Sequence, residues 1–487
     1  MEYTKRFYWF VGVCLANFSL AANAQNKDLK TGWQYRETKT EKWYPATVPG
    51  EIHTDLLNNK TIPDPFYRDN EKKLTWIEKK DWEYKTTFQV SPATLAKKHT
   101  ELVFDGLDTY ATVYLNNQVV LKADNMFLQW RVDVKKVLKS GNNNLVIVFK
   151  SAQNVVDSLA KKDLPFVIPD NPRAYVRKAQ YHFGWDWGPK FTTCGIWKTP
   201  RLEAYDKKEA EKPYVLDRKI ELVQEPDKVG KTFYFKIDGK PVYMKGANYI
   251  PSDAFLSRVT KKEYEKVIGM AKDANMNMLR VWGGGIYEDD YFYDLCDKNG
   301  IYVWQDFMFA GTMVPGDDAF FANVKKEVQY QVKRLRHHKS IVLWCGNNEI
   351  DEAFKDWGWQ KSMKMPKQDS IRLWKDYVRL FQDSIPKWVK EVDDKRPYIS
   401  SSPSFHWSKA KSLTEGDSHY WGTWWGLEDV EAVQNKTGRF VSEYGMQAMP
   451  NYSSIERFTK AEDRYLYSDI LQAHQKAGKG FSVTHVY

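Results

Sequence analysis

Two glutamates in the second half of the chain stand where paired carboxylates could carry out acid–base chemistry. Glu349 follows the apolar stretch LWCGNN, and Glu443 follows the apolar stretch FVS. Most of the 63 acidic residues are expected to be surface charges, but this interpretation weakens for a glutamate flanked by a buried strand. Two carboxylates in one site can hydrolyse a glycosidic bond, because one protonates the leaving oxygen while the other attacks the sugar or activates water.

The sequence around these glutamates predicts a barrel of parallel strands. From residue 241 onwards, strand-like runs alternate with stretches that place apolar residues at helical spacing, and eight such βα units would close a (β/α)₈ barrel. The predicted strands are 241–246, 278–282, 301–306, 341–346, 397–402, 417–421 and 439–443, and the predicted helices include 260–274, 288–298, 318–337, 370–392 and 464–477. Chemistry in such barrels lies at the C-terminal ends of the strands, where Glu349 and Glu443 fall.

The first half of the chain predicts an antiparallel β-sandwich of the jelly-roll type. Its short runs of β-branched and aromatic residues are 83–90, 101–104, 110–115 and 144–149. Turn residues separate these runs, and no helical pattern intervenes. We therefore expect a multidomain chain with a signal peptide at 1–24, a sandwich at 25–205, a linker at 206–240 and a seven-stranded (β/α)₈-type barrel at 241–487.

Short motifs between residues 185 and 445 resemble those of glycoside hydrolase family 2, and five of them, which occur in order, narrow the resemblance to its β-mannosidases; the resemblance covers nearly all of residues 30–480. NNE after the fourth barrel strand and SEYG at the seventh resemble the acid/base and nucleophile motifs of retaining glycosidases on (β/α)₈ barrels. The motifs that narrow the resemblance are WDWGP at 185–189, GANYIPSD at 246–253, LRVWGGGIYE at 279–288, WQDFMFA at 304–310 and HYWGTW at 419–424.

The resemblance implies retaining hydrolysis of terminal β-D-mannose residues with defined roles for strand-end side chains. Glu443 would be the nucleophile, and Glu349 would act first as acid and then as base. Asn348 would hydrogen-bond the sugar 2-hydroxyl, and Arg280 would pair with Glu443 and keep it ionised. Asp306 would hold either a sugar hydroxyl or another residue of the site.

Aromatic residues are expected to form the walls of a sugar site. The chain has 20 Trp, most of which belong to ordinary cores, but aromatic rings also stack on the C–H faces of sugars. Trp282, Trp357 and Trp421 are the candidates for sugar stacking, with a core position as the alternative for each. Trp185 and Asp186 are expected to reach from a loop of the sandwich over the mouth of the barrel.

Two segments of the family pattern are short or missing. Members of the family usually carry a middle immunoglobulin-like domain, whereas here only 206–240 fills that place, with 217–224 as one remnant strand. No eighth barrel unit and no C-terminal domains are visible after the seventh strand. Because the missing unit would support the strand of Glu443, we expect impaired activity.

The remaining features limit the location and the partners of the protein. Lys5 and Arg6 precede a largely apolar run that ends in Ala22-Asn23-Ala24, which predicts a cleaved signal peptide and a secreted or periplasmic protein without a membrane span. The net charge of +10 is spread along the chain, so nucleic acid is a poor candidate partner.

The expected substrates are β-mannosides, manno-oligosaccharides or oligosaccharides derived from glycans, and the oligomeric state stays open. After signal cleavage three cysteines remain, with no metal-binding spacing, so we expect no metal or other cofactor. Two alternatives remain for the function: another exo-β-glycosidase of the family, such as a β-glucosaminidase, or a sugar-binding remnant that does not hydrolyse.

Overall fold

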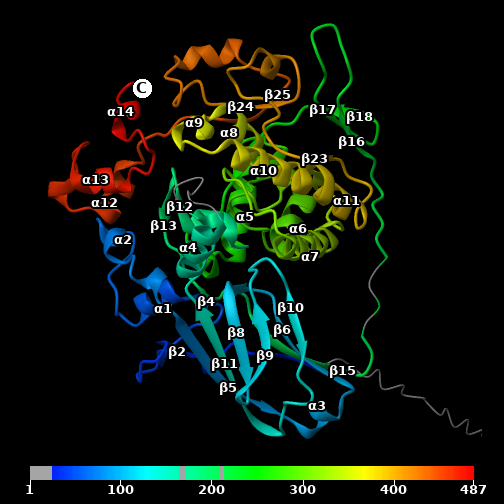
Figure 1. Cartoon of the computed structure of the whole chain (residues 1–487), viewed down its shortest axis with the longest axis vertical. Coiled ribbons are helices and arrows are strands. Elements are labelled where there is room, and N and C mark those ends of the chain that lie inside the picture. The colour runs from blue at the N-terminus through cyan, green and yellow to red at the C-terminus, as the bar shows by residue number, and fades with distance from the viewer. Residues whose placement is uncertain (1–24, 164–171, 209, 211–212) are drawn as a thin grey trace, which may run out of the picture.

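The structure of the protein is a computed structural model that describes residues 25–163, 172–208, 210 and 213–487. The predicted signal peptide lies outside these residues. Figure 1 shows an antiparallel sandwich at one end of the molecule and a barrel of strands and helices at the other. The predicted fold class is therefore confirmed: a β-sandwich is followed by an incomplete (β/α)₈ barrel.

The sandwich consists of two antiparallel sheets and a small third one. The larger sheet has the order β3-β2-β5-β11-β8-β9, and the facing sheet has the order β1-β15-β6-β10. The bounds of these strands are β1 Gln25–Asp28, β2 Gln34–Glu37, β3 Tyr44–Pro45, β5 Trp82–Val90, β6 His99–Phe104, β8 Tyr110–Leu115, β9 Gln118–Ala123, β10 Trp130–Asp133, β11 Gly141–Lys150 and β15 Arg201–Tyr205. The small sheet joins β4 Gly50–Glu51, β14 Gly195–Ile196 and β7 Leu107–Asp108.

Alternating burial explains why these runs form a sandwich. Every second residue of β5 is buried, and β11 alternates in the same way, so each strand turns one face to the core. The four predicted strands correspond to β5, β6, β8 and β11. The expectation that no helix intervenes was wrong, because the chain also forms α1 Ile52–Asn58, α2 Asn70–Lys73, α3 Pro92–Ala96 and α4 Ala152–Asp163.

A three-stranded antiparallel sheet follows the sandwich, where one remnant strand was expected. It is formed by β16 Ile220–Val223, β17 Tyr234–Ile237 and β18 Lys240–Val242. Its buried residues Ile220 and Phe235 share a hydrophobic cluster with Trp304 and Leu343 of the barrel strands. The segment therefore packs on the barrel as a small apolar cover.

The barrel contains five adjacent parallel strands and a separate parallel pair. The five are β19 Gly246–Tyr249, β20 Met278–Val281, β21 Tyr302–Asp306, β22 Ile341–Cys345 and β23 Tyr398–Ile399, and the pair is β24 Asp417–Tyr420 and β25 Phe440–Tyr444. The helices between them are α5 Lys261–Asp273, α6 Asp290–Asn299, α7 Asp318–Leu335, α8 Ile350–Asp356, α9 Trp359–Ser362, α10 Lys367–Tyr377 and α11 Ile385–Lys390.

Two barrel predictions need correction. The first barrel strand is Gly246–Tyr249 and not 241–246, because the start of the predicted run belongs to β18 of the preceding sheet. The predicted helix 370–392 is divided into α10, a π-helical turn at Val378–Ser384, and α11.

No strand of the described residues lies between β25 and β19. The two strands are linked by a hydrogen bond in which Asn248 Nδ2 donates to the carbonyl oxygen of Ser442 at 3.2 Å. Three of the four residues of β19 are exposed, which agrees with an open strand edge. The seven predicted barrel strands are thus present, whereas the expected impairment of activity stays a prediction.

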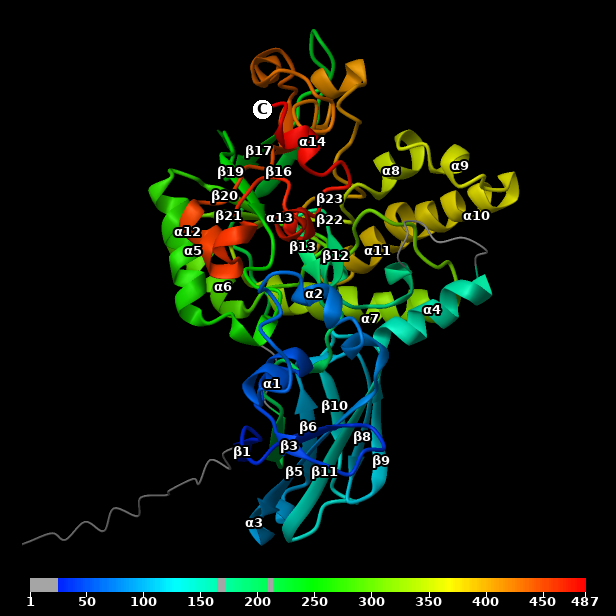
Figure 2. The same cartoon turned by 90° about the vertical axis from the view of Figure 1, so that its left-hand side faces the viewer.

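The last part of the chain folds back onto the sandwich. Its helices are α12 Tyr452–Phe458, α13 Asp469–His474 and α14 Phe481–Thr484, and Figure 1 and Figure 2 both place α13 beside α2. Arg68 pairs with Asp463 at 2.8 Å, and the Arg68 carbonyl contacts His474 Nε2 at 2.7 Å. The predicted helix 464–477 is shorter in the structure, where it comprises only α13. Among the described helices, none combines the length and the apolar character that a membrane span requires.

Candidate active site

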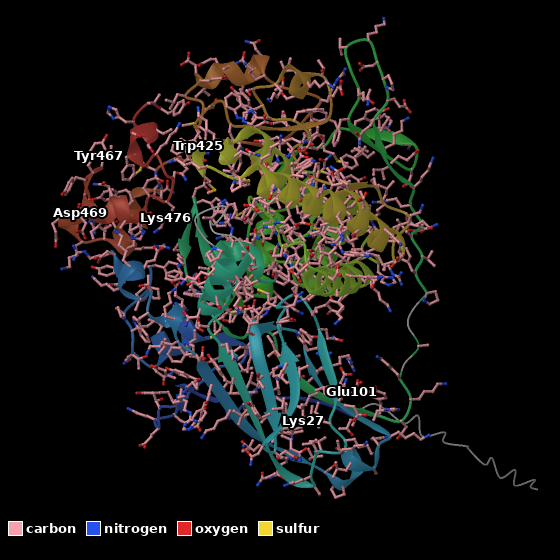
Figure 3. All side chains as sticks on the ribbon, viewed as in Figure 1. Lys27, Glu101, Trp425, Tyr467, Asp469 and Lys476 are labelled. Atoms are coloured by element: carbon pink, nitrogen blue, oxygen red, sulfur yellow. The ribbon has the colours of Figure 1, made fainter. Side chains whose placement is uncertain are left out.

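A deep pocket opens at the C-terminal ends of the barrel strands. Its volume is about 1290 Å³, larger than a typical small-ligand site, because it continues into the space beside β19 and β25. Nine of the ten predicted site residues line it: Trp185, Asp186, Arg280, Trp282, Asn348, Glu349, Trp357, Trp421 and Glu443. Trp425, labelled in Figure 3 between the C-terminal helices and α8–α9, lines the same pocket.

The two glutamates predicted as the catalytic pair face each other across His419. The ring nitrogen Nδ1 of His419 lies 2.8 Å from Glu349 Oε1 and 3.4 Å from Glu443 Oε2. One oxygen of each carboxylate and this nitrogen all lie within 4.8 Å of one another. The two carboxylates therefore share one site, as hydrolysis of a glycosidic bond by a pair of carboxylates requires.

Arg280 connects the residues at the ends of four strands. Its guanidinium forms an ion pair with Glu443, and its Nη2 donates to Asp306 Oδ2 at 2.8 Å and to Asn348 Oδ1 at 2.7 Å. Its Nη1 also donates to Asn248 Oδ1 at 2.8 Å. The predicted pairing of Arg280 with Glu443 is present, and it holds Asn348 and Asn248 in the same network.

Asp306 holds Arg280 and does not line the pocket. Its Oδ2 accepts hydrogen bonds from Arg280 and from the backbone N–H of Gly283, and its Oδ1 accepts from Trp304 Nε1 at 2.9 Å. The side chain is fully buried. Of the two roles expected for Asp306, the geometry favours the contact with another site residue over the contact with a sugar.

The electrostatic surroundings of the two glutamates differ. Burial raises the pKa of Glu349 to about 7, and its direct partners are the amide of Asn348 and the ring of His419. Burial also raises the pKa of Glu443, but His419 and the Arg280 guanidinium oppose that shift. Because the ion pair of Arg280 goes to Glu443 and not to Glu349, Glu443 is the carboxylate that stays ionised more easily.

The backbone holds Glu349 in an uncommon conformation. Glu349 precedes α8 as its N-cap and has φ of 62°, in the left-handed region that non-glycine residues seldom adopt. Strain of this kind persists where the surroundings fix it, and it is frequent at functional sites. The backbone N–H of Glu349 donates to the Ser402 carbonyl at 2.7 Å, which fixes the end of β22 against the segment after β23.

A hairpin of the sandwich covers one side of the pocket. Trp185 ends β12 Phe183–Trp185, which pairs with β13 Gly188–Lys190, and Asp186 lies in the turn between them. Burial raises the pKa of Asp186 to about 6, and the charge of Glu349 adds to this shift. The expectation that Trp185 and Asp186 reach the barrel mouth is therefore met by their position in the structure.

Buried contacts between the domains fix this hairpin. Arg177 forms an ion pair with Glu327 of α7 through bonds of 2.7 and 2.8 Å, and both side chains are almost fully buried. Nearer the hairpin, the backbone N–H of Tyr181 donates to the Gly284 carbonyl at 3.0 Å. The position of Trp185 thus depends on packing of the sandwich against the barrel, which the alternation of residues within one strand does not predict.

Tryptophans form the walls of the pocket. The ring centroids of Trp185 and Trp282 are 4.7 Å apart in an edge-to-face contact, and Trp187 contacts Trp282 at 5.4 Å. Trp282 is buried, whereas Trp357 is 43% exposed at the rim. Trp421 packs beside the cluster of Trp424 and also lines the pocket. Stacking of a sugar on these rings stays a prediction.

Several pocket residues were not predicted from the sequence. Glu352 lies one helical turn after Glu349, is buried, and has one carboxylate oxygen without a hydrogen bond. Burial and the charge of Glu349 raise its pKa to about 9. His419 does not line the pocket but contacts both glutamates, and burial lowers its pKa to about 4. The spacing Glu349-x-x-Glu352 on a helix start was the one signal available for Glu352.

Glu349, His419 and Glu443 also have the make-up of a small metal site, since each offers a ligand atom within 4.8 Å of the others. Each carboxylate already has a partner in the structure, because Arg280 pairs with Glu443 and His419 contacts Glu349. The expectation that the chemistry needs no metal stays a prediction. The cysteines Cys194, Cys296 and Cys345 are buried free thiols.

Comparison with known proteins finds relatives of this chain among the glycosyl hydrolases. Residues 33–198 match the model of the glycosyl hydrolase 2 galactose-binding domain-like family, and residues 230–468 match that of the glycosyl hydrolases family 2 TIM barrel domain. The curated β-mannosidase B of Neosartorya fischeri is 33% identical over 564 residues, which cover 93% of this chain and 66% of that protein. The β-mannosidase of Rattus norvegicus is 31% identical over 95% of this chain and 66% of its own length.

A solved structure agrees with these matches. The crystal structure of the β-D-mannosidase from Dictyoglomus thermophilum has a TM-score of 0.85 and 34% identity, and the match covers 94% of this chain and 68% of that one. This chain spans about two thirds of the length of the curated relatives. Both domain models and these relatives lead to one conclusion: the chain belongs to glycoside hydrolase family 2.

Proposed function

We propose that the protein is a retaining exo-β-mannosidase that releases terminal, non-reducing β-D-mannose through a covalent glycosyl-enzyme. The observation that carries this proposal is the pair Glu349 and Glu443. One oxygen of each lies within 4.8 Å of the other, and Arg280 forms an ion pair with Glu443 alone of the two. The named relatives at 31–34% identity support the choice of mannose as the sugar.

The geometry supports a two-step reaction. In the first step a Glu443 oxygen forms a bond to the anomeric carbon while the glycosidic C–O bond breaks, and Glu349 gives its proton to the leaving oxygen. In the second step water attacks the anomeric carbon and displaces Glu443, while Glu349 takes the proton from that water. In this proposal Asn348, whose Oδ1 accepts a hydrogen bond from Arg280 Nη2 at 2.7 Å, contacts the sugar hydroxyl beside the reacting carbon.

The hairpin over the pocket supports attack at the end of a sugar chain. Trp185, Asp186 and Trp187 occupy one side of the pocket, and Trp282 packs edge-to-face against two of them. A wall of this kind leaves room for the terminal sugar and blocks extension of a glycan beyond it. We also propose that the enzyme acts outside the cytoplasm, because residues 1–24 have the composition of a signal peptide.

A panel of chromogenic substrates tests the proposed function. At equal concentrations, 4-nitrophenyl β-D-mannoside should be hydrolysed faster than the β-glucoside, β-galactoside and β-glucosaminide. Faster cleavage of the β-glucosaminide would assign another family activity. Binding of mannobiose without release of mannose after long incubation would instead identify a sugar-binding protein that does not hydrolyse.

We expect a bell-shaped dependence of kcat/KM on pH with its falling limb near pH 7. The first step needs Glu349 protonated and Glu443 ionised, so the rate rises as Glu443 loses its proton and falls as Glu349 loses its own. Burial raises the pKa of Glu349 to about 7, which places the falling limb there. Initial rates with 4-nitrophenyl β-D-mannoside from pH 4 to 9 measure both limbs. A rate that keeps rising above pH 8 would contradict the acid role of Glu349.

A further inference from the structure

Arg173 is a buried cation in the wall of the pocket with no anionic partner among the described residues. It lies in the short helical turn Arg173–Tyr175 that leads to the hairpin of Trp185. Arg173 is only 8% exposed, yet it lines the same pocket as Glu349 and Glu443. Its Nε has no hydrogen-bond partner.

The contacts of Arg173 place it beside the residues of the site. Its guanidinium carbon lies 4.7 Å from the centre of the Trp185 ring. One of its terminal nitrogens, Nη2, is 3.6 Å from the position that a Cβ would occupy at Gly311. Gly311 in turn donates its backbone N–H to the Asn348 carbonyl at 3.0 Å, directly before Glu349. Arg173 is therefore held between the aromatic wall and the strand end that carries the acid.

Arg177, four residues further on, is a buried arginine that has a structural role, and it differs from Arg173 in having a carboxylate partner. Arg177 makes two bonds to Glu327, and the pair neutralises itself inside the domain interface. Burial lowers the pKa of Arg173 to about 10, and no carboxylate among the described residues opposes that shift. A buried charge without a counter-ion is unfavourable, and the contact with Trp185 offsets only part of this cost.

We propose that Arg173 forms an anion subsite of the pocket, which binds a carboxylate, sulfate or phosphate group carried by the glycoside substrate. The inference rests on the proposed function in one respect: it takes the molecule that carries the anion to be a glycoside. A guanidinium suits this ligand because its donors match the oxygens of such groups in pairs. The protein would then select acidic glycosides over neutral ones of the same sugar. Asp186 and Glu349 line the pocket too, but neither forms an ion pair with Arg173 among the described residues.

Binding of inorganic sulfate and phosphate to the full chain tests the subsite without relying on catalysis. Isothermal titration at constant ionic strength should give a dissociation constant that Arg173→Met raises by about 10–100-fold, the effect of losing charged hydrogen bonds. Arg173→Lys keeps the charge and should retain part of the affinity. Lys190→Met is the matched control, because Lys190 is a cation of the same hairpin that pairs with Glu78 at 2.8 Å and does not line the pocket.

Equal affinity in the wild type and in Arg173→Met would overturn the proposal, and so would the absence of saturable binding. Arg173→Gln provides a second neutral variant if Arg173→Met fails to fold, which circular dichroism would show. Sulfate binding that depends on Arg173 in a chain without β-mannosidase turnover would support the subsite and reject the proposed function, so the two failures are distinguishable.

Two pairs of substrates locate the anion. The first pair is 4-nitrophenyl β-D-mannoside with and without a 6-phosphate, and the second is β-mannosyl glucose and β-mannosyl glucuronic acid. In the wild type the ratio of kcat/KM for the acidic to the neutral member should exceed that of Arg173→Met by about tenfold or more in one pair. A higher ratio in the first pair places the anion on the mannose, and in the second on the leaving unit. Unchanged ratios in both pairs would contradict recognition of an acidic glycoside.

Discussion

Replacing Glu443 by Gln should lower kcat by about 10⁴–10⁶-fold, the range known for loss of an enzyme nucleophile. Glutamine keeps the size of the side chain, but its amide cannot form the ester to the anomeric carbon. Arg280 retains Asp306 as a carboxylate partner in the variant, so the buried cation is not left alone. Initial rates with 4-nitrophenyl β-D-mannoside measure the loss.

A covalent label identifies the nucleophile directly. A 2-deoxy-2-fluoro-β-mannosyl fluoride should add one sugar mass to the wild type, and digestion should place it on Glu443. The Glu443→Gln variant should stay unlabelled. Glu456→Gln is the control, because Glu456 lies on α12 with its side chain 47% exposed and should leave turnover near the wild-type level. A label on Glu349 would show that the two roles are exchanged.

The meeting of Glu349 and Glu443 in one site could be predicted from the sequence, because their positions depend on local pattern. Glu349 and Glu443 each follow a run of apolar residues, and parallel strands of a barrel direct their C-terminal ends to one place. The same pattern fails for the first strand of the barrel. Three of the four residues in Gly246–Tyr249 are exposed, whereas Pro241–Val242 belongs to β18 of the small sheet that covers the barrel.

Residues whose role comes from another domain were harder to predict. Arg173 and Arg177 are four residues apart and have the same side chain. Arg177 pairs with Glu327, whereas Arg173 lines the pocket. Only the packing of the sandwich on α7 separates them. Asp306 was assigned from its place at a strand end, and the structure shows that Arg280, Trp304 and Gly283 already occupy both of its oxygens.

The polar network between the glutamates also depends on contacts that are distant in the sequence. His419 contacts Glu349 through one ring nitrogen, and its other ring nitrogen lies 3.0 Å from the hydroxyl of Ser402. Ser402 in turn donates to Asp417 at 2.6 Å. No periodic pattern marks such a chain of contacts, because its residues come from three strands: Glu349 follows β22, Ser402 follows β23, and Asp417 and His419 belong to β24. The network fixes the orientation of the Glu349 carboxylate.

Replacing Glu349 by Ala should lower kcat/KM by about 10²–10⁴-fold for substrates with poor leaving groups, such as mannobiose, because the leaving oxygen then departs without a proton. With 2,4-dinitrophenyl β-D-mannoside the first step should be nearly unaffected, since this leaving group needs no protonation. The second step should become slow, because no base removes the proton from the attacking water. A burst of dinitrophenol followed by a slow steady state would show this change of the limiting step.

Azide distinguishes the role of Glu349 from a general loss of structure. A small anion fits the space left by the missing side chain and attacks the glycosyl-enzyme without a base. Azide should therefore raise the steady-state rate of Glu349→Ala and yield the β-mannosyl azide, the anomer that two inversions produce. Glu352→Gln is the matched control, because Glu352 lines the same pocket three residues further on and should show no azide-dependent rate. An α-azide from Glu349→Ala would mean that azide had replaced the nucleophile, and Glu443 would then have to be the acid.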